Sequence, residues 1–170
     1  MMRRWDRGLM LPLLIAGLLS GCVTLSSLEG YQPKTQDEAM IVASLMRIPN
    51  GIRNRSVDQI LQAYTDDALI GNFHKYLGVS GVGAQVNLSK RDLVGVYTQI
   101  FRASKDIAVS VRNFELTVTG DRALAEAMTE LTFKQEAGRK ESKSDVYRNE
   151  VLWRIRRTPA GWRIYEEIWQ

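Results

Sequence analysis

Few side chains in this sequence could carry acid–base, nucleophilic or metal chemistry. His74 is the only histidine and Cys22 is the only cysteine. A neutral imidazole can act as an acid or a base near neutral pH, so His74 is a weak candidate catalytic residue, and a solvent-facing loop histidine is the alternative. One histidine and one cysteine cannot make a zinc site, so we expect no metal. No phosphate-binding glycine loop is evident, and we expect no cofactor.

The candidate ligand-binding residues are polar or aromatic groups near the centre of the domain: Asn72, His74, Tyr97 and Asn149. Asn149 shares its strand parity with apolar and aromatic residues, including Tyr147 and Val151, so its amide should face the interior. An amide buried without a partner costs about 1–3 kcal/mol. Asn149 is therefore expected to bond a ligand, Asn72 or the backbone.

The N-terminus predicts export and lipid attachment. Arg3, Arg4 and Arg7 precede an uncharged, Leu-rich run from Leu9 to Leu19. That run has the length of a signal-peptide core and is shorter than the about 20 apolar residues of a membrane-spanning helix. It ends in Leu-Ser-Gly-Cys at residues 19–22, which resembles the lipobox of bacterial lipoproteins. The resemblance implies cleavage before Cys22 and a lipid on this cysteine.

We accordingly divide the chain into a signal peptide (1–21), a lipidated cysteine with a flexible tether (22–35), and one domain (36–170). Loss of the three Arg and one Asp of the leader lowers the formal net charge from +4 to +2. This mild charge gives no reason to expect nucleic acid as a partner. Anchoring at the cell envelope is expected. In a diderm host, Val23 favours the periplasmic face of the outer membrane, because inner-membrane retention usually uses Asp at that position.

The candidate site residues must be positioned by the secondary structure of the domain, which the sequence predicts to be helices followed by strands. Hydropathy periods predict helices over 36–48, 57–64 and 90–101, then antiparallel strands over 106–118, 123–134, 145–157 and 162–169. Pro49 should end or kink the first helix. A short strand should begin at Ala68. The parity of the apolar residues reverses near Arg112-Asn113, which indicates a β-bulge. Helices followed by strands predict an α+β fold.

This order, with Tyr-Thr-Asp-Asp-Ala-Leu-Ile at residues 64–70 and Gly-Trp-Arg-Ile at residues 161–164, resembles the nuclear transport factor 2-like (SnoaL-like) superfamily. The resemblance covers about residues 37–169. It implies a cone-shaped, curved antiparallel sheet wrapped around N-terminal helices, with a pocket between helices and sheet. It also implies a tendency to form homodimers through the sheet.

The resemblance argues against one well-defined enzyme type. The catalytic aspartate of ketosteroid isomerases corresponds here to Asn72, which cannot act as a general base, and their helix tyrosine corresponds to about Ile48. Their third residue falls near Asn149 or Glu150. Dehydratase-like and cyclase-like sites rest on His and Asp in the pocket, and His74 is the only histidine for that role.

Three functions follow, from different classes. The leading hypothesis is a membrane-tethered envelope lipoprotein that binds a small or lipid-like apolar ligand without catalysis. The first alternative is a small cyclase, dehydratase or isomerase that uses His74. The second is an envelope interaction or scaffold protein that acts through its sheet face. The sequence does not identify the ligand, and it leaves the question of catalysis open.

Overall fold

The structure is a computed structural model that describes residues 26–76, 87–135 and 144–170. The helices are α1 (Gln36–Leu45), α2 (Arg47–Arg53), α3 (Val57–Leu61), α4 (Phe73–Tyr76) and α5 (Lys90–Ala103). The strands are β1 (Tyr64–Gly71), β2 (Asn87–Ser89), β3 (Ser104–Thr119), β4 (Arg122–Gln135), β5 (Ser144–Thr158) and β6 (Gly161–Trp169).

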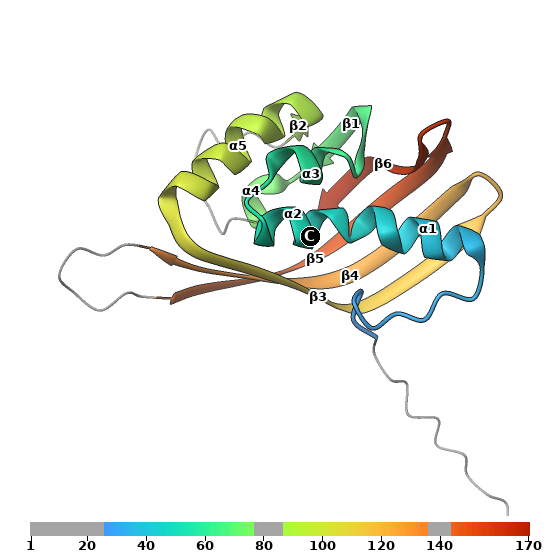
Figure 1. Cartoon of the computed structure of the whole chain (residues 1–170), viewed down its shortest axis with the longest axis horizontal. Helices are drawn as coiled ribbons and strands as arrows, with labels where there is room; N and C mark the ends of the chain where they lie inside the picture. Colours follow the sequence, from blue (N-terminus) through green and yellow to red (C-terminus); the bar gives the residue numbers. More distant parts are fainter. Residues whose placement is uncertain (1–25, 77–86, 136–143) are drawn as a thin grey trace, which may run out of the picture.

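The six strands form one curved sheet in the order β2-β1-β6-β5-β4-β3. The helices lie together over one face of this sheet, as Figure 1 shows. Strands β3 to β6 pair in antiparallel fashion as predicted, whereas β1 lies parallel to β6. The predicted α+β class, with a curved sheet wrapped around helices, is confirmed. The parallel pair and the short strand β2 were not predicted.

The starts of three helices follow the local rules of helix capping. Thr35, Ser56 and Ser89 each accept a hydrogen bond from a backbone N–H in the first turn of α1, α3 and α5. Ser89 and Asp92 form a reciprocal capping box at the start of α5. These bonds satisfy donors that have no partner within the helix.

The first helix breaks between α1 and α2, one turn before Pro49, where the proline ring would clash with the carbonyl of a continuing helix. The expected break or kink is confirmed, although it lies at Leu45–Arg47 rather than after residue 48, and Pro49 is the third residue of α2. A missing N–H in the first turn removes no intrahelical bond, so proline is tolerated there. Gly51 lies further along α2, where a Cβ atom would come within 2.5 Å of the Ile60 side chain and 2.9 Å of its backbone nitrogen. This glycine therefore permits the close approach of α2 to α3.

The strands differ from the prediction mainly in their irregular positions. The bulge near Arg112-Asn113 is confirmed: the pairing of β3 with β4 shifts between Arg112 and Glu115. Asn113 has a left-handed φ of 53°, a conformation that asparagine tolerates better than most residues. Strand β1 begins at Tyr64 rather than at Ala68.

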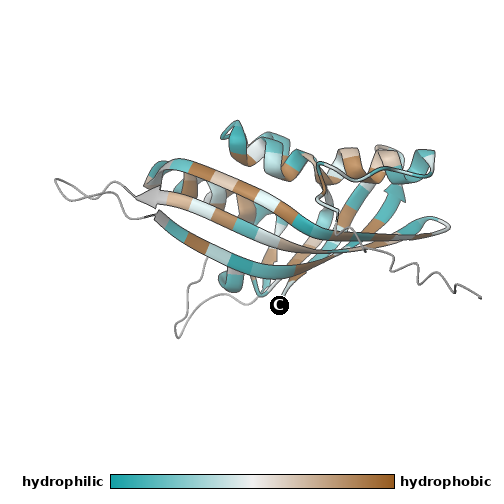
Figure 2. Ribbon diagram, turned by 90° about the horizontal axis from the view of Figure 1, so that it is seen from below, coloured by the Kyte–Doolittle hydropathy of each residue, from teal (hydrophilic) through white to brown (hydrophobic). Residues whose placement is uncertain are grey.

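One face of the sheet is buried against the helices and the other is polar. Hydrophilic and hydrophobic residues alternate along the long strands in Figure 2. Val151, Trp153 and Ile155 of β5 are each at most 2% exposed. On the opposite face, Arg148 pairs with Glu130 on β4, and Arg154 pairs with Glu166 on β6. Charged pairs of this kind stabilise neighbouring strands modestly.

The segment before α1 is packed against the sheet in its described part, unlike the expected flexible tether. Leu28 is 1% exposed, and its backbone N–H donates to the carbonyl of Val111 on β3. The N–H of Phe114 donates to the carbonyl of Ser26, and the Tyr31 ring meets the Phe114 ring edge-on at 5.1 Å. The packed domain thus includes the described residues from Ser26 onward. Within the described ranges, no helix has the length and apolar character needed to span a membrane.

Candidate functional site

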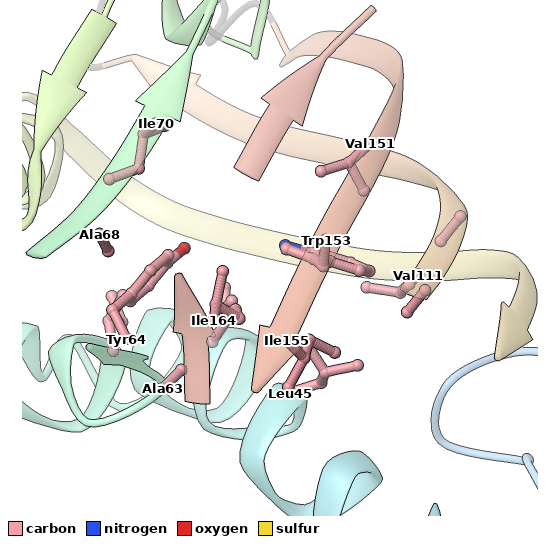
Figure 3. Packing of buried hydrophobic residues seen from close by; sticks show 14 of the residues in the cluster. Leu45, Ala63, Tyr64, Ala68, Ile70, Val111, Val151, Trp153, Ile155 and Ile164 are labelled. Carbon is pink, nitrogen blue, oxygen red and sulfur yellow. The ribbon is translucent and has the colours of Figure 1, made fainter. Parts of the chain in front are cut away.

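The most unusual group in the interior is the carboxyl of Glu167 on β6, whose residue is 1% exposed. Its Oε2 accepts hydrogen bonds from the Tyr64 hydroxyl at 2.6 Å and the Trp153 indole N–H at 2.8 Å. Its Oε1 accepts the Trp169 indole N–H at 2.7 Å. Figure 3 shows the Tyr64 oxygen and the Trp153 nitrogen pointing toward one another from β1 and β5. We call these four residues the Glu167 centre.

A second bulge, on β6, turns Glu167 inward. Strict alternation after Trp162 and Ile164 would place Glu166 inside and Glu167 outside. The pairing with β5 instead shifts at Tyr165, because Ile155 pairs with Ile164 while the adjacent Arg154 pairs with Glu166. The extra residue reverses the facing of the rest of the strand. Glu167 and Trp169 therefore share the buried face.

Burial raises the pKa of the Glu167 carboxyl, because a charged carboxylate loses its hydration inside the domain. The bonds from Tyr64, Trp153 and Trp169 act in the opposite direction and only partly offset this effect. None of the cationic side chains in the described ranges forms an ion pair with Glu167. The centre is thus a buried acid held by neutral donors alone.

The interior beside this centre is nearly filled. A cavity of about 10 Å³ remains, lined by Leu45 and Ile48 from the helices, Tyr97 from α5, and the Glu167 centre. This space is close to the minimum for one water molecule. The ligand-sized pocket implied by the family resemblance is therefore closed in this structure.

The carboxyl nevertheless keeps room for one more partner. A carboxyl offers about four hydrogen-bonding positions, all acceptors when ionised and one of them an O–H donor when protonated, and the three donors fill two on Oε2 and one on Oε1. The open position lies on Oε1. A single donor from water or a ligand would complete the shell of Glu167.

Tyr97 and Asn72, two of the residues singled out in the sequence, lie near this interior in different roles. Tyr97 is 2% exposed, lines the cavity, and meets the Phe73 ring edge-on at 6.1 Å. Asn72 has a left-handed φ of 58°, and its amide donates to the carbonyl of Trp169 at 3.1 Å. Asn72 therefore joins the turn after β1 to the end of β6, and its side-chain N–H is engaged by backbone.

His74 and Asn149 do not line the interior cavity. Asn149 faces the inner side of β5, as its parity predicted, and is half-buried opposite Thr129. His74 lies on α4, and its Nδ1 is buried without a hydrogen-bond partner. Such atoms are rare in folded proteins. Cys22, the predicted lipidation site, is outside the described residues.

The sequence analysis missed Glu167, Trp153 and Trp169 as site residues. Trp153 and Trp169 are buried, and simple alternation along β6 would have placed Glu167 on the outer face. The inward-facing residues of β6 follow the spacing Trp162-x-Ile164-x-x-Glu167-x-Trp169, in which the alternation shifts by one residue. This spacing indicates a bulge only when it is already known that both Ile164 and Trp169 face the core. Within the described ranges, no group of histidine, cysteine or acidic residues could hold a metal ion.

The comparisons with known proteins identify the fold. A ketosteroid isomerase-like protein from Erwinia carotovora atroseptica superposes with a TM-score of 0.58 at 18% identity, over 79% of this chain and 95% of that one. An NTF2-like protein with a cystatin-like fold from Novosphingobium aromaticivorans gives 0.61 at 18% identity, over 78% and 80%. A candidate aromatic ring hydroxylase from Novosphingobium aromaticivorans gives 0.64 at 18% identity, over 82% and 91%. No family model and no curated protein matches the sequence.

Proposed function

The domain has the NTF2-like fold, and we propose that it binds a small, largely apolar molecule at the Glu167 centre. We further propose that the protein is an exported lipoprotein of the cell envelope, anchored through a lipid on Cys22. The binding proposal rests on one observation: a buried carboxyl, which pairs with no cation in the described ranges, lies beside a cavity whose other lining side chains, apart from Thr129, are apolar or aromatic.

A carboxyl in such a place is costly to keep for stability alone. Desolvation penalises its charged form, and an apolar side chain would fill the same volume without that penalty. Strongly perturbed carboxyls inside a fold are enriched at functional sites. The open lone pair on Oε1 would accept a hydroxyl or amine of the ligand, while Trp153, Trp169 and Tyr97 would contact its apolar part.

Binding requires the interior to open, because about 10 Å³ cannot hold a ligand. The helical wall is the part that must move, since the sheet wall is fixed by continuous strand pairing. Ile48 and Tyr97 line the cavity from this helical side. A ligand would therefore have to shift the domain from this closed arrangement toward an open one.

Native mass spectrometry of the full chain, produced in a bacterium and released from detergent, tests both parts of the proposal. We expect the intact mass to show a chain that begins at Cys22 and carries acyl groups. We also expect an additional small molecule that is lost on denaturation. Glu167→Gln should retain less of it than wild type, whereas Glu130→Gln, altered on the outer face, should retain the same amount. A ligand-free wild type, or equal retention by both variants, would contradict the binding proposal.

An enzyme of the cyclase, dehydratase or isomerase type is the second candidate. Burial raises the pKa of the Glu167 carboxyl, which makes it a candidate general acid, and the Nδ1 of His74 is a second buried polar atom without a hydrogen-bond partner. If turnover of the retained molecule is found, Glu167→Gln should abolish it. Loss of turnover in His74→Ala would show that His74 on α4 also takes part in the reaction. Full turnover in both variants would exclude the enzyme function.

A further inference from the structure

A second site is indicated at the end of the sheet where β1 starts and the β5–β6 turn lies (Figure 1). An open groove of about 510 Å³ is lined there by side chains from five parts of the chain. They include Gln62 after α3, Lys90 at the start of α5, Arg156 on β5 and Arg163 on β6. Asp66 and Asp67 of β1 line the same groove.

Two of these cations are already neutralised. The Lys90 ammonium pairs with Asp66 at 2.8 Å, and Arg156 pairs with Asp67 at 2.5 Å. The guanidinium of Arg156 holds the pKa of the Asp67 carboxyl below its usual range. The two aspartates are thereby occupied, and neither carboxylate pairs with Arg163.

Arg163 and Arg47 both lack an acidic partner in the described ranges. No carboxylate in the described ranges lies within ion-pair distance of either guanidinium. Arg163 is half-buried and donates to the carbonyl of Trp162 at 2.7 Å, folded back over the turn beside Gly161. Partial burial and the nearby charge of Arg47 both lower the pKa of Arg163.

Gln62 lines the groove beside Arg163 and joins Arg47 to it. Arg47 donates to the carbonyl and to the side-chain Oε1 of Gln62, at 3.2 Å and 3.3 Å. With its oxygen engaged in this way, the amide N–H₂ group of Gln62 remains available as a donor. Arginine forks and neutral N–H donors are the groups with which proteins hold phosphate oxygens.

We infer that this groove binds a phosphate group, held by Arg163 and the amide of Gln62, which line it, and by Arg47, which is hydrogen-bonded to Gln62 next to the groove. The two uncompensated positive charges match the charge of a phosphate monoester. A bound dianion would replace the repulsion between the guanidiniums with charge-assisted hydrogen bonds. The groove is open enough to admit the phosphate of a soluble ester or the headgroup of a lipid. This inference does not depend on the Glu167 centre.

The test is calorimetric titration of the full chain, held in neutral detergent, with inorganic phosphate and with short-chain phosphatidic acid. We expect the double variant Arg47→Gln/Arg163→Gln to bind at least one of these probes about tenfold more weakly than wild type, a loss comparable with that of a charge-assisted hydrogen bond. Arg148→Gln is the matched control, because Arg148 lies on the same strand as Arg156 but pairs with Glu130 away from the groove. Binding of inorganic phosphate would identify a soluble ligand, and binding of phosphatidic acid alone would identify a lipid headgroup.

Two results would overturn the inference. The first is equal binding by the double variant and Arg148→Gln. The second is a wild-type response that sodium chloride of equal ionic strength reproduces, since this would be general screening. A urea unfolding curve guards against misfolding of the double variant. Because the repulsion is removed, its midpoint at low salt should be at or above that of wild type.

Discussion

Glu167 shows how one residue can set the pH response of a domain. Its folded-state pKa is raised by burial above the ordinary value of 4.5. The folded state therefore binds the proton more tightly than the unfolded chain does. This contribution to stability is fully present below the unfolded pKa, and it is lost as the pH rises through the folded pKa.

Replacing Glu167 with Gln should remove this dependence. We expect the unfolding free energy of Glu167→Gln, relative to wild type, to increase as the pH rises above 4.5 toward neutrality. Loss of one hydrogen bond would add a constant penalty of about 1–3 kcal/mol, so the slope is the informative quantity. Urea unfolding at several pH values measures it.

Glu130→Gln is the control for this measurement. The hydrogen bond from Arg148 lowers the pKa of Glu130, so its carboxyl is ionised in both folded and unfolded states above 4.5. Its contribution is present above the unfolded pKa and is lost only as the pH falls through the folded pKa. The difference between Glu130→Gln and wild type should be flat in the window where Glu167→Gln changes. A flat line for Glu167→Gln would show that its carboxyl is ionised throughout.

At the scale of the helices, replacing either of two glycines with alanine should change the stability in opposite directions. Gly51→Ala in α2 would force its Cβ against the side chain and backbone of Ile60 on α3, at a cost of about 1–3 kcal/mol. Gly95→Ala in α5 meets nothing within 4 Å and should stabilise the protein by about 0.5–1 kcal/mol, because alanine is the better helix former. Urea unfolding of the two variants measures both effects. Equal effects in the two variants would mean that α2 and α3 are not in close contact.

The elements also show which features can be predicted from sequence. The bulge at Asn113 was predictable because apolar residues lie on both sides of it and their parity reverses. The inward facing of Asn149 was predictable because β5 alternates without interruption. The bulge at Tyr165 was not, since apolar Ile168 and Trp169 follow it in adjacent positions and either could face the core. Glu167, and with it the candidate site, depends on that choice.

Long-range pairing set the remaining limits. The parallel pairing of β1 with β6 joins residues about a hundred positions apart in the sequence. Local hydropathy patterns do not predict such a pairing. The break between α1 and α2 was predictable from Pro49, since a proline disrupts the helix one turn before itself. Arg47 and Arg163 are brought together only by this packing, so the phosphate groove had no sequence signature.

At the scale of the whole molecule, the segment before α1 is part of the packed domain. Leu28 is buried and lines the same cavity as Glu167. We expect Leu28→Ala to destabilise the domain by about 2–5 kcal/mol, as for other buried leucines. The neighbouring Glu29→Ala, on an exposed residue, should change stability by less than about 0.5 kcal/mol. Thermal and urea unfolding provide the measurement, and similar small effects for both would restore the view of a flexible tether.

The proposed anchor at Cys22 gives the position of Leu28 a mechanical consequence. Three residues lie between Cys22 and Ser26, and the four residue-to-residue steps from one to the other span at most about 14 Å. The segment between Cys22 and Ser26 is too short to let the domain move far from a bilayer that holds Cys22. Tension on it would load the two hydrogen bonds at Val111 and Phe114 first and would then draw Leu28 out of the cavity wall. Strain in the envelope would thereby act directly on the volume beside Glu167.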